Sequence, residues 1–363
     1  MANLPEEIVA EILSRLPVSS LCRFRCVSKS WRSLISEPNF IRLHLNHNTT
    51  TTDHHRLILI SDFYKLYSVD LHSPEFTQDS IAIYLKFPPD RNPNRFGQIC
   101  GSCDGLLLMR DYISYFLLNP STRESKEVPN SPFSVKSGYS FNLNGFGHDS
   151  SKDDYKVVRI SHCDCAADCA ENIVSVFSLR TNTWRRIEDS PYDHSFHERL
   201  PGVFVSGAVH WLACTTGVGS NDSTVIASLD LAKEKFQSVP CPGSAGDILI
   251  EELGVLGGCL CALGFCHSGC QDVWVMKKYG VRDSWTKFTI NYGNFPFWNP
   301  LCFSRTGQVL LESGHSLVIF DQEEKTFKEL KVKGRPAQFK AGVYVESLVQ
   351  LQQYDKGALP STI

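Results

Sequence analysis

The sequence predicts an α+β, multidomain protein in which a small helical domain precedes an all-β body. Three observations support this fold class. Sixteen of the forty residues from Leu4 to Leu43 are Leu, Ile, Val, Phe or Trp, and several recur at helical spacing. From residue 56 onward, short apolar runs are broken by Gly, Asp, Asn and Pro, which is typical of strands and turns. A strand–turn–strand unit then recurs about every fifty residues.

Composition limits the class of protein before any motif is considered. A chain of 363 residues with 42% hydrophobic and 21% charged residues is typical of a soluble globular protein with more than one domain. No run approaches eighteen apolar residues, and the start lacks the layout of a signal peptide, so we expect no membrane association and a cytoplasmic and/or nuclear location. The fourteen cysteines are then expected to be reduced. The net charge of −3 favours no nucleic-acid partner.

The first forty-five residues predict three or four short helices. Pro5 suits a first helical position, and Ile8, Ile12 and Leu16 follow at four-residue steps until Pro17 ends the helix. Ser19 or Ser20 is the expected cap of a second helix.

Ser28 is the expected cap of a third helix, which carries Trp31 and which Pro38 closes. A domain of this size lies near the lower limit for independent folding. Leaving several of its large apolar side chains in water would be costly, at roughly 1.5–3 kcal/mol for each. A partner surface, either in the same chain or in another protein, explains their abundance.

The run "LPEEIVAEILSRLPVSSLCRFRCVSKSWRSLISEPNF" resembles the F-box of plant F-box proteins along its whole length. The resemblance implies that this domain binds a Skp-type adaptor and, through it, a cullin scaffold that supports ubiquitin transfer. It assigns one set of positions to the apolar core and adaptor-facing surface, namely Leu4, Pro5, Ile8, Ile12, Leu13, Leu16, Pro17, Leu21, Val27 and Trp31. It also makes Lys29, Arg23 and Arg25 candidates for polar contacts at the rim.

Two other interpretations of this segment stay open. Any one of these apolar residues can belong to the domain's own core, because three short helices need an interior. A helix-turn-helix DNA-binding domain also combines short helices with arginines. Leu21, Phe24 and Val27 stand among the basic residues, however, and residues 46 to 363 carry a net charge of −5, so DNA binding is disfavoured.

The repeated unit of the body predicts a kelch-like β-propeller of about six blades. Copies include "YFLLNPSTRESKEV", "VSVFSLRTNTWRRI", "VIASLDLAKEKFQSV" and "LVIFDQEEKTFKEL". Intervals of 42 to 61 residues separate the positions chosen to mark the turns, which are Asp70, Asn119, Arg180, Asp230, Tyr279 and Asp321. An irregular β-sandwich is the alternative fold.

Two details of the propeller can be predicted. An aromatic residue that can pack between blades recurs in four units, as Trp184, Phe236, Trp285 and Phe327. The late strand "AGVYVESLVQL" is expected to complete the blade that begins at "RLILIS", which would close the ring and remove an exposed sheet edge.

The body also resembles the F-box-associated interaction domain of kelch-type and S-locus F-box-like plant proteins. The pieces "GSCDGLLLM", "NPSTRESKEVP", "GFGHDSSKDDYKVVRI", "GAVHWLA" and "YVESLV" occur in the family's order. We therefore expect an F-box at 1–45, a linker at 46–55, the propeller at 56–350 and a tail at 351–363.

Several motifs suggest chemistry but fit structural roles better. "GSCDG" would make Cys103 a nucleophile only on a strand-to-helix turn, whereas the "LLLM" after it predicts a hairpin turn at Asp104-Gly105. Two groups contain possible zinc ligands, namely His162, Cys163, Cys165 and Cys169, and Cys259, Cys261, Cys266, His267 and Cys270. Neither has the usual structural-zinc spacing.

The adjacent acids Asp153–Asp154 and Glu251–Glu252 would point to opposite faces of a strand, so we expect turn or surface charge there rather than a catalytic pair. No Walker-type phosphate loop is present, and no cofactor or metal is expected. The sequence thus predicts a non-catalytic, substrate-recruiting adaptor subunit of an SCF-type cullin ubiquitin ligase. A propeller enzyme of glycoside hydrolase type and a protein-binding propeller without a ligase are the alternatives.

The target protein would bind loops between strands, because a rigid sheet can hold variable tips. The candidate segments are 88–99, 129–143, 161–172, 190–201 and 214–223.

Overall fold

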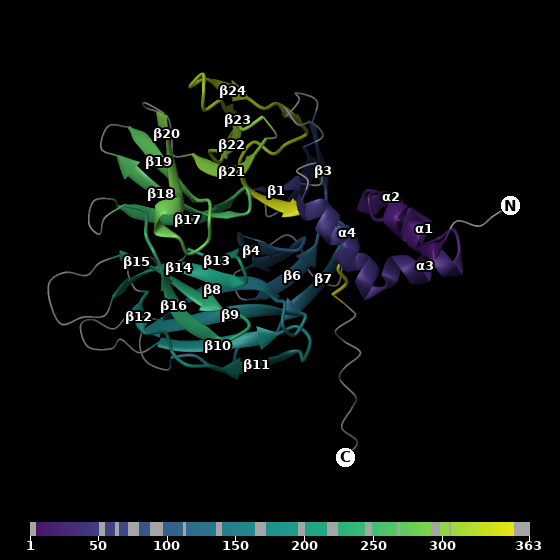
Figure 1. Cartoon of the computed structure of the whole chain (residues 1–363), viewed down its shortest axis with the longest axis horizontal. Helices are drawn as coiled ribbons and strands as arrows, with labels where there is room; N and C mark the ends of the chain where they lie inside the picture. Colours follow the sequence, from purple (N-terminus) through teal and green to yellow (C-terminus); the bar gives the residue numbers. More distant parts are fainter. Residues whose placement is uncertain are drawn as a thin grey trace, which may run out of the picture. The chain divides into compact units, whose positions relative to one another are not determined.

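The computed structural model describes residues 5–50, 55–61, 65–71, 80–87, 97–111, 114–135, 140–163, 172–194, 200–215, 224–243, 249–266, 269–291, 298–304 and 306–351. Within these ranges, four α-helices precede six sheets of four or five strands (Figure 1). The sheets are the blades of a six-bladed β-propeller. The predicted fold class and the predicted number of blades are both confirmed.

The helix boundaries and caps of the helical domain agree in part with those predicted. Its helices are α1 (Glu6–Leu13), α2 (Val18–Phe24), α3 (Lys29–Ser36) and α4 (Pro38–Thr50). Pro5 and Pro17 directly precede α1 and α2 with φ of −52° and −56°. The predicted caps Ser19 and Ser20 are wrong, because α2 begins at Val18 and contains both. Ser28 caps α3 as predicted, accepting a hydrogen bond from the Trp31 amide at 3.1 Å.

Helix α4 differs most from the sequence interpretation. Pro38 ends α3, as expected, but also opens α4, which extends through residue 50 into the segment interpreted as a linker. The polar composition of 46–50 was misleading because Asn48 is fully buried and hydrogen-bonded, as is His44 one turn earlier. Both lie on the face of α4 that carries buried Phe40, Ile41 and Leu45.

The first blade joins the two ends of the β-body. Its strand order is β25-β3-β2-β1-β26, with β1 (His55–Ser61), β2 (Leu66–Asp70), β3 (Ser80–Tyr84), β25 (Val332–Lys333) and β26 (Phe339–Val345). Strand β1 pairs antiparallel with β26 from His55 opposite Val345 to Ser61 opposite Phe339, and the yellow β26 lies beside β1 in Figure 1. The predicted closure by "AGVYVESLVQL" is therefore confirmed.

The other five blades each use strands consecutive in sequence. The second blade contains β4 (Gln98–Cys103), β5 (Leu106–Arg110), β6 (Tyr115–Asn119) and β7 (Glu124–Val128), and the third contains β8 (Ser140–Asp149), β9 (Asp154–Cys163), β10 (Asn172–Ser178) and β11 (Thr183–Arg186). The fourth blade contains β12 (Tyr192–Asp193), β13 (Val203–Val205), β14 (Ala208–Thr215), β15 (Thr224–Asp230) and β16 (Lys235–Val239). The fifth contains β17 (Ile250–Leu256), β18 (Cys259–Cys266), β19 (Cys270–Met276) and β20 (Trp285–Asn291), and the sixth contains β21 (Asn299–Phe303), β22 (Val309–Glu312), β23 (Leu317–Phe320) and β24 (Phe327–Glu329). A 3₁₀ turn, η4 (Arg282–Ser284), precedes β20.

Internal contacts divide the chain into two compact units. One contains the helices, the first blade and the β4–β7 blade, and the other contains the blades β8–β11, β12–β16 and β17–β20. The first unit has an apolar core that includes Ile58, Leu107 and Tyr344. The second has two apolar clusters, one around Val158 and Val209 and the other around Leu212, Ile250 and Leu260.

The same hydrogen-bonded turn recurs between the last two strands of several blades. The side-chain oxygen of the first residue accepts hydrogen bonds from the amides two and three residues later, and the fifth residue has positive φ. The first and fifth residues are Asn119 and Arg123, Asp230 and Glu234, and Asp321 and Lys325. In the β10–β11 hairpin the corresponding turn starts at Ser178, so the marker Arg180 was placed two residues late.

The four repeated aromatic residues occupy equivalent places on outer strands. Trp184, Phe236, Trp285 and Phe327 lie opposite Phe177, Leu229, Met276 and Phe320 respectively. Phe236 and Trp285 each pack against a cluster drawn from two blades, as predicted. Phe327 is 42% exposed and its ring lies 4.9 Å from that of Phe320 in the same blade, so packing between blades stays a prediction for that position.

Candidate protein-binding surfaces

Helix α1 exposes two large apolar side chains. Ile8 and Ile12 are 47% and 52% exposed, and their four-residue spacing places them on one face of the helix. Val27, in the turn after α2, is 66% exposed. Exposed large apolar side chains of this kind are candidates for contact with another protein.

The interior of the helical domain is already filled by other residues. Leu13, Val18, Leu21, Ile35 and Phe40 are each no more than 3% exposed. Exposure of Ile8, Ile12 and Val27 therefore does not reflect a missing core.

The structure divides the predicted adaptor-binding residues into groups. Leu4 lies outside the described residues. The exposed members are Pro5, Ile8, Ile12, Pro17, Val27 and Lys29. Leu16 and Trp31 are half-buried, whereas Leu13 and Leu21 are buried and belong to the core. Six of the eleven residues can thus reach a partner directly.

The basic residues predicted at the rim also differ from one another. Arg23 is exposed and donates to Ser20 Oγ at 3.1 Å, so it remains accessible. Arg25 is half-buried and donates from Nη2 to the Ile35 carbonyl at 3.3 Å, which joins the end of α2 to the end of α3. The rings of Phe24 and Trp31 meet edge to face at 5.3 Å and support the same junction.

Polar contacts attach the helical domain to the first blade. His44 in α4 bonds the Leu16 carbonyl through Nε2 at 3.0 Å. Asn48 donates from Nδ2 to the Glu346 carbonyl at 2.9 Å. The Glu346 carboxylate pairs with Arg56 of β1 at 2.7 Å, and Arg56 also pairs with Asp70 of β2 at 2.7 Å.

Sequence analysis missed this attachment, although a signal was present. Phe40, Ile41, His44, Leu45 and Asn48 follow helical spacing along one face. Two polar residues at positions where the pattern requires burial indicate a buried hydrogen-bond anchor.

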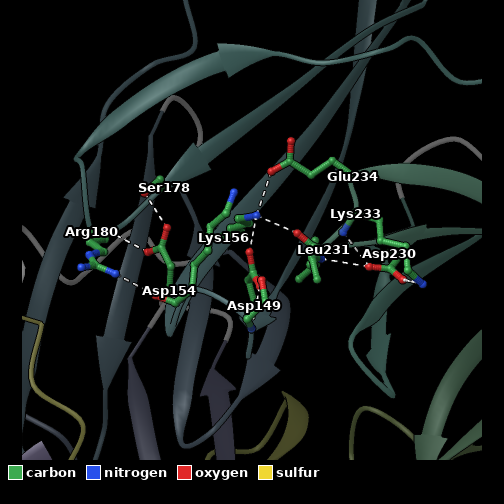
Figure 2. Close-up of polar contacts among 12 residues, drawn as sticks. Asp149, Asp154, Lys156, Ser178, Arg180, Asp230, Leu231, Lys233 and Glu234 are labelled. Carbon is green, nitrogen blue, oxygen red and sulfur yellow. Dashed lines mark hydrogen bonds and ion pairs between the residues drawn. The ribbon is translucent and has the colours of Figure 1, made fainter.

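The second unit contains a buried ion cluster centred on Lys156 of β9 (Figure 2). Lys156 Nζ lies 2.6 Å from Asp149 Oδ2 and 2.8 Å from Glu234 Oε1, and donates to the Leu231 carbonyl at 2.6 Å. Burial alone would raise the pKa of Asp149, but hydrogen bonds from Lys156 and Ser151 and the lysine charge outweigh it and lower that pKa. The cluster ties the β8–β9 hairpin to the β15–β16 turn.

Asp154 has a structural role that the sequence did not predict. Its side chain is buried, accepts from Ser178 Oγ and accepts from the Arg180 amide at 2.8 Å (Figure 2). The expectation of surface charge is therefore wrong for Asp154, whereas Asp153 is exposed. A turn amide and a hydroxyl satisfy the buried carboxylate.

The Cys103 segment forms the predicted hairpin. Asp104 and Gly105 adopt φ of 51° and 80°, and Cys103 pairs with Leu106 across the turn. Because a strand follows the cysteine, the backbone lacks the strand-to-helix turn that a nucleophile elbow needs. Cys103 is also buried.

The cysteine-rich segments lie partly outside the described residues. Positions 164–171 and 267–268 fall there, so Cys165, Cys169 and His267 lie outside the described residues. His162 is buried and stacks on Phe141 at 5.2 Å. Across the described ranges, no group of three or more His, Cys, Asp or Glu side chains could hold a metal ion.

Cys270 corrects the expectation that all thiols are reduced, because it is disulfide-bonded. It stands directly opposite Cys266 in the β18–β19 pairing. Strand pairing thus places opposite each other two cysteines that sequence analysis listed among the possible zinc ligands. By contrast, Cys100, Cys103, Cys214, Cys261 and Cys302 are buried and form no disulfide.

Among the described residues, no helix is long and apolar enough to cross a membrane. The fold and surfaces instead define a modular protein, in which a helical domain with exposed apolar side chains is joined to a six-bladed propeller.

Comparison with known proteins assigns both modules. Residues 1–43 match the F-box domain, and residues 56–351 match the F-box associated beta propeller domain. The chain therefore belongs to the F-box proteins that carry an F-box-associated β-propeller.

Relatives in Arabidopsis thaliana match this chain over most of their length. F-box protein CPR1 is 36% identical, with 96% of this chain and 89% of the relative covered. An F-box/kelch-repeat protein is 32% identical, with 88% of each chain covered. A third F-box protein is 30% identical over 96% of this chain and 90% of its own length.

Proposed function

We propose that this protein is a substrate-recruiting subunit of an SCF-type cullin ubiquitin ligase. The helical domain binds a Skp-type adaptor, which connects to a cullin scaffold, and the propeller binds a target protein. Membership of the F-box family and the two-module fold support this assignment. The complex acts in the cytoplasm and/or nucleus, without nucleic acid or membrane as a partner.

The exposed apolar side chains of the F-box carry the proposal. Ile8, Ile12 and Val27 keep 47%, 52% and 66% of their surface exposed in a domain whose core is complete. Covering them with an adaptor removes apolar area from water, at about 25 cal/mol per Å². Lys29 and Arg23 are exposed and can form polar contacts beside them.

The chain performs no covalent step in this mechanism. It holds the target and the adaptor on one framework, so target lysines meet the ubiquitin carrier at raised effective concentration. Direct attachment of α4 to the first blade supports this role, because two hydrogen-bonded modules keep a defined separation better than a flexible linker does.

Co-purification with a plant Skp-type adaptor tests the proposal. We expect the wild-type chain to capture the adaptor and the double variant Ile8→Glu/Ile12→Glu to capture at least about tenfold less, a loss of about 1.4 kcal/mol or more. Glu is a good helix former, so α1 should persist. Val281→Glu, which alters an equally exposed apolar residue (46%) of the second unit, is the matched control and should bind normally.

Circular dichroism of each variant separates lost binding from lost folding. Absence of capture by the folded wild-type chain would contradict the proposal. Capture by the double variant at the wild-type level would show that the α1 surface is not the docking site.

A further inference from the structure

A surface pocket lies within the first unit of the propeller. Its volume is about 330 Å³. Ile60 and Phe339 supply buried apolar walls, while His315, Gln338 and Lys340 supply polar groups. Gly97 and Gly314 also belong to its lining. This volume is near the lower end of ligand pockets, roughly 300–1,000 Å³, and suits one or two side chains of a bound protein segment.

The pocket lies at the end of the first blade that is distant from the F-box. Strands β1 and β26 run antiparallel, with His55 opposite Val345 at one end and Ser61 opposite Phe339 at the other. Glu346, which follows the first of these ends, receives the hydrogen bond from Asn48 of α4. The pocket is at the second end, about 20 Å away at roughly 3.3 Å per residue. A segment bound there leaves the F-box accessible to its adaptor.

The charge of the pocket favours an anion. Lys340 is exposed, and none of the ion pairs found among the described residues involves it. Arg335 lies beside the pocket. It donates a hydrogen bond to the His315 carbonyl at 2.6 Å, and its guanidinium carbon lies over the Phe339 ring, 5.6 Å from the ring centroid. The described lining contains no acidic residue.

Two acids lie close to this region and have partners. The Glu312 carboxylate accepts from the Gly314 amide. Glu329 lies 3.6 Å from Arg335 and offsets part of its charge. Lys340 is therefore the principal uncompensated charge at the described lining.

We propose that this pocket binds an acidic side chain of the target protein. The carboxylate pairs with Lys340, Gln338 supplies a hydrogen-bond donor, and the methylene groups pack against Ile60 and Phe339. This inference rests on the proposed function, because it specifies the target chemistry that the propeller recognises.

Fluorescence anisotropy with the full chain and a labelled hexaglutamate peptide at low ionic strength tests the proposal. We expect saturable binding that weakens as salt is added, and no comparable binding of a hexaglutamine peptide. Lys340→Glu should weaken hexaglutamate binding at least tenfold. The matched control Lys328→Glu reverses the charge of an exposed residue on the outer strand β24. Its affinity for hexaglutamate should stay within twofold of the wild-type value.

Three results would overturn the pocket assignment: no saturable hexaglutamate binding by the wild-type chain, a loss of less than threefold in Lys340→Glu, or an equal loss in Lys328→Glu. Circular dichroism verifies that both variants are folded.

Adaptor capture, measured on the same protein samples, distinguishes a failure of the pocket proposal from a failure of the proposed function. Lys340→Glu should capture the Skp-type adaptor as well as wild type does. Capture without hexaglutamate binding overturns the pocket alone, whereas failure of the wild-type chain to capture the adaptor overturns the ligase role and the pocket's place in it.

Discussion

Asn48 in α4 donates a hydrogen bond to the carbonyl of Glu346, 298 residues later in the chain, at 2.9 Å. Both residues are buried, and the Glu346 carboxylate continues the contact to Arg56 at the start of the propeller. The F-box is thus joined to the blade that contains both ends of the β-body. This attachment gives the F-box and the first blade a common framework.

Asn48→Ala should loosen this attachment. The substitution leaves the buried Glu346 carbonyl without its donor, at a cost of about 1–3 kcal/mol. We expect α4 amides to exchange with deuterium about tenfold or more faster, measured by mass spectrometry. Asn39→Ala, at an exposed position in the same helix, should leave the exchange unchanged, and a similar acceleration there would contradict the role assigned to Asn48.

Lys156→Met should strongly destabilise the second unit. It leaves the buried Asp149 carboxylate without its cation and removes one of the two cations that pair with the partly buried Glu234, and breaking such a cluster costs about 3–5 kcal/mol. The urea midpoint should fall accordingly. Lys233→Met breaks only the exposed pair with Asp230 and should cost about 1 kcal/mol or less. Equal losses would show that burial of the cluster contributes little.

The stability difference between wild type and Lys156→Met should also depend on pH. The pKa of Asp149 is lowered in the folded protein from an ordinary value of 3.8, so its contribution is present above that pH and is lost as pH falls through the folded pKa. Urea unfolding at pH 7 and below pH 4 should therefore show the difference narrowing in acid. A difference that widens in acid would contradict the assigned direction.

His210 should make the protein less stable in mild acid. Burial lowers its pKa from 6.5 to about 4, and the neutral ring donates to the Val203 carbonyl through Nδ1 and accepts from Tyr279 through Nε2. Because the unfolded chain binds this proton more readily, stability should fall as pH drops from 7 to 5, by on the order of 2 kcal/mol. His210→Gln should reduce that fall, whereas His315→Gln, at an exposed residue, should retain it.

Gly145→Ala should disrupt packing between β8 and β14. A Cβ atom at Gly145 would collide with Val209 and Trp211, and overpacking of this kind costs about 1–3 kcal/mol. Gly254→Ala in β17 is the matched control, because nothing lies within 4 Å of its added methyl group. Thermal unfolding should show a lower midpoint for Gly145→Ala only, and equal midpoints for both variants would contradict this account.

Local signals predicted most of the architecture. Strand–turn units near a fifty-residue spacing indicated the propeller, and the late apolar strand indicated its closure, which the pairing of β1 with β26 confirms. Ser28 was recognised as a helix cap because capping acts over three residues. By contrast, Ser19 and Ser20 have the same chemistry but lie inside α2, since Pro17 starts that helix earlier.

The amino-acid pattern by itself determined the helical and β-rich segments, their order and the family, because periodicity, turns and motifs are local properties. Only the tertiary structure decided which apolar residues of the F-box face water. Ile12 and Leu13 are neighbours in sequence, yet one is 52% exposed and the other 3%, because packing against other helices selects one face. Packing between distant segments also brings Asn48 to Glu346 and Lys340 to the pocket. Individual side-chain contacts between residues distant in sequence depend on how the segments pack, which no local pattern specifies.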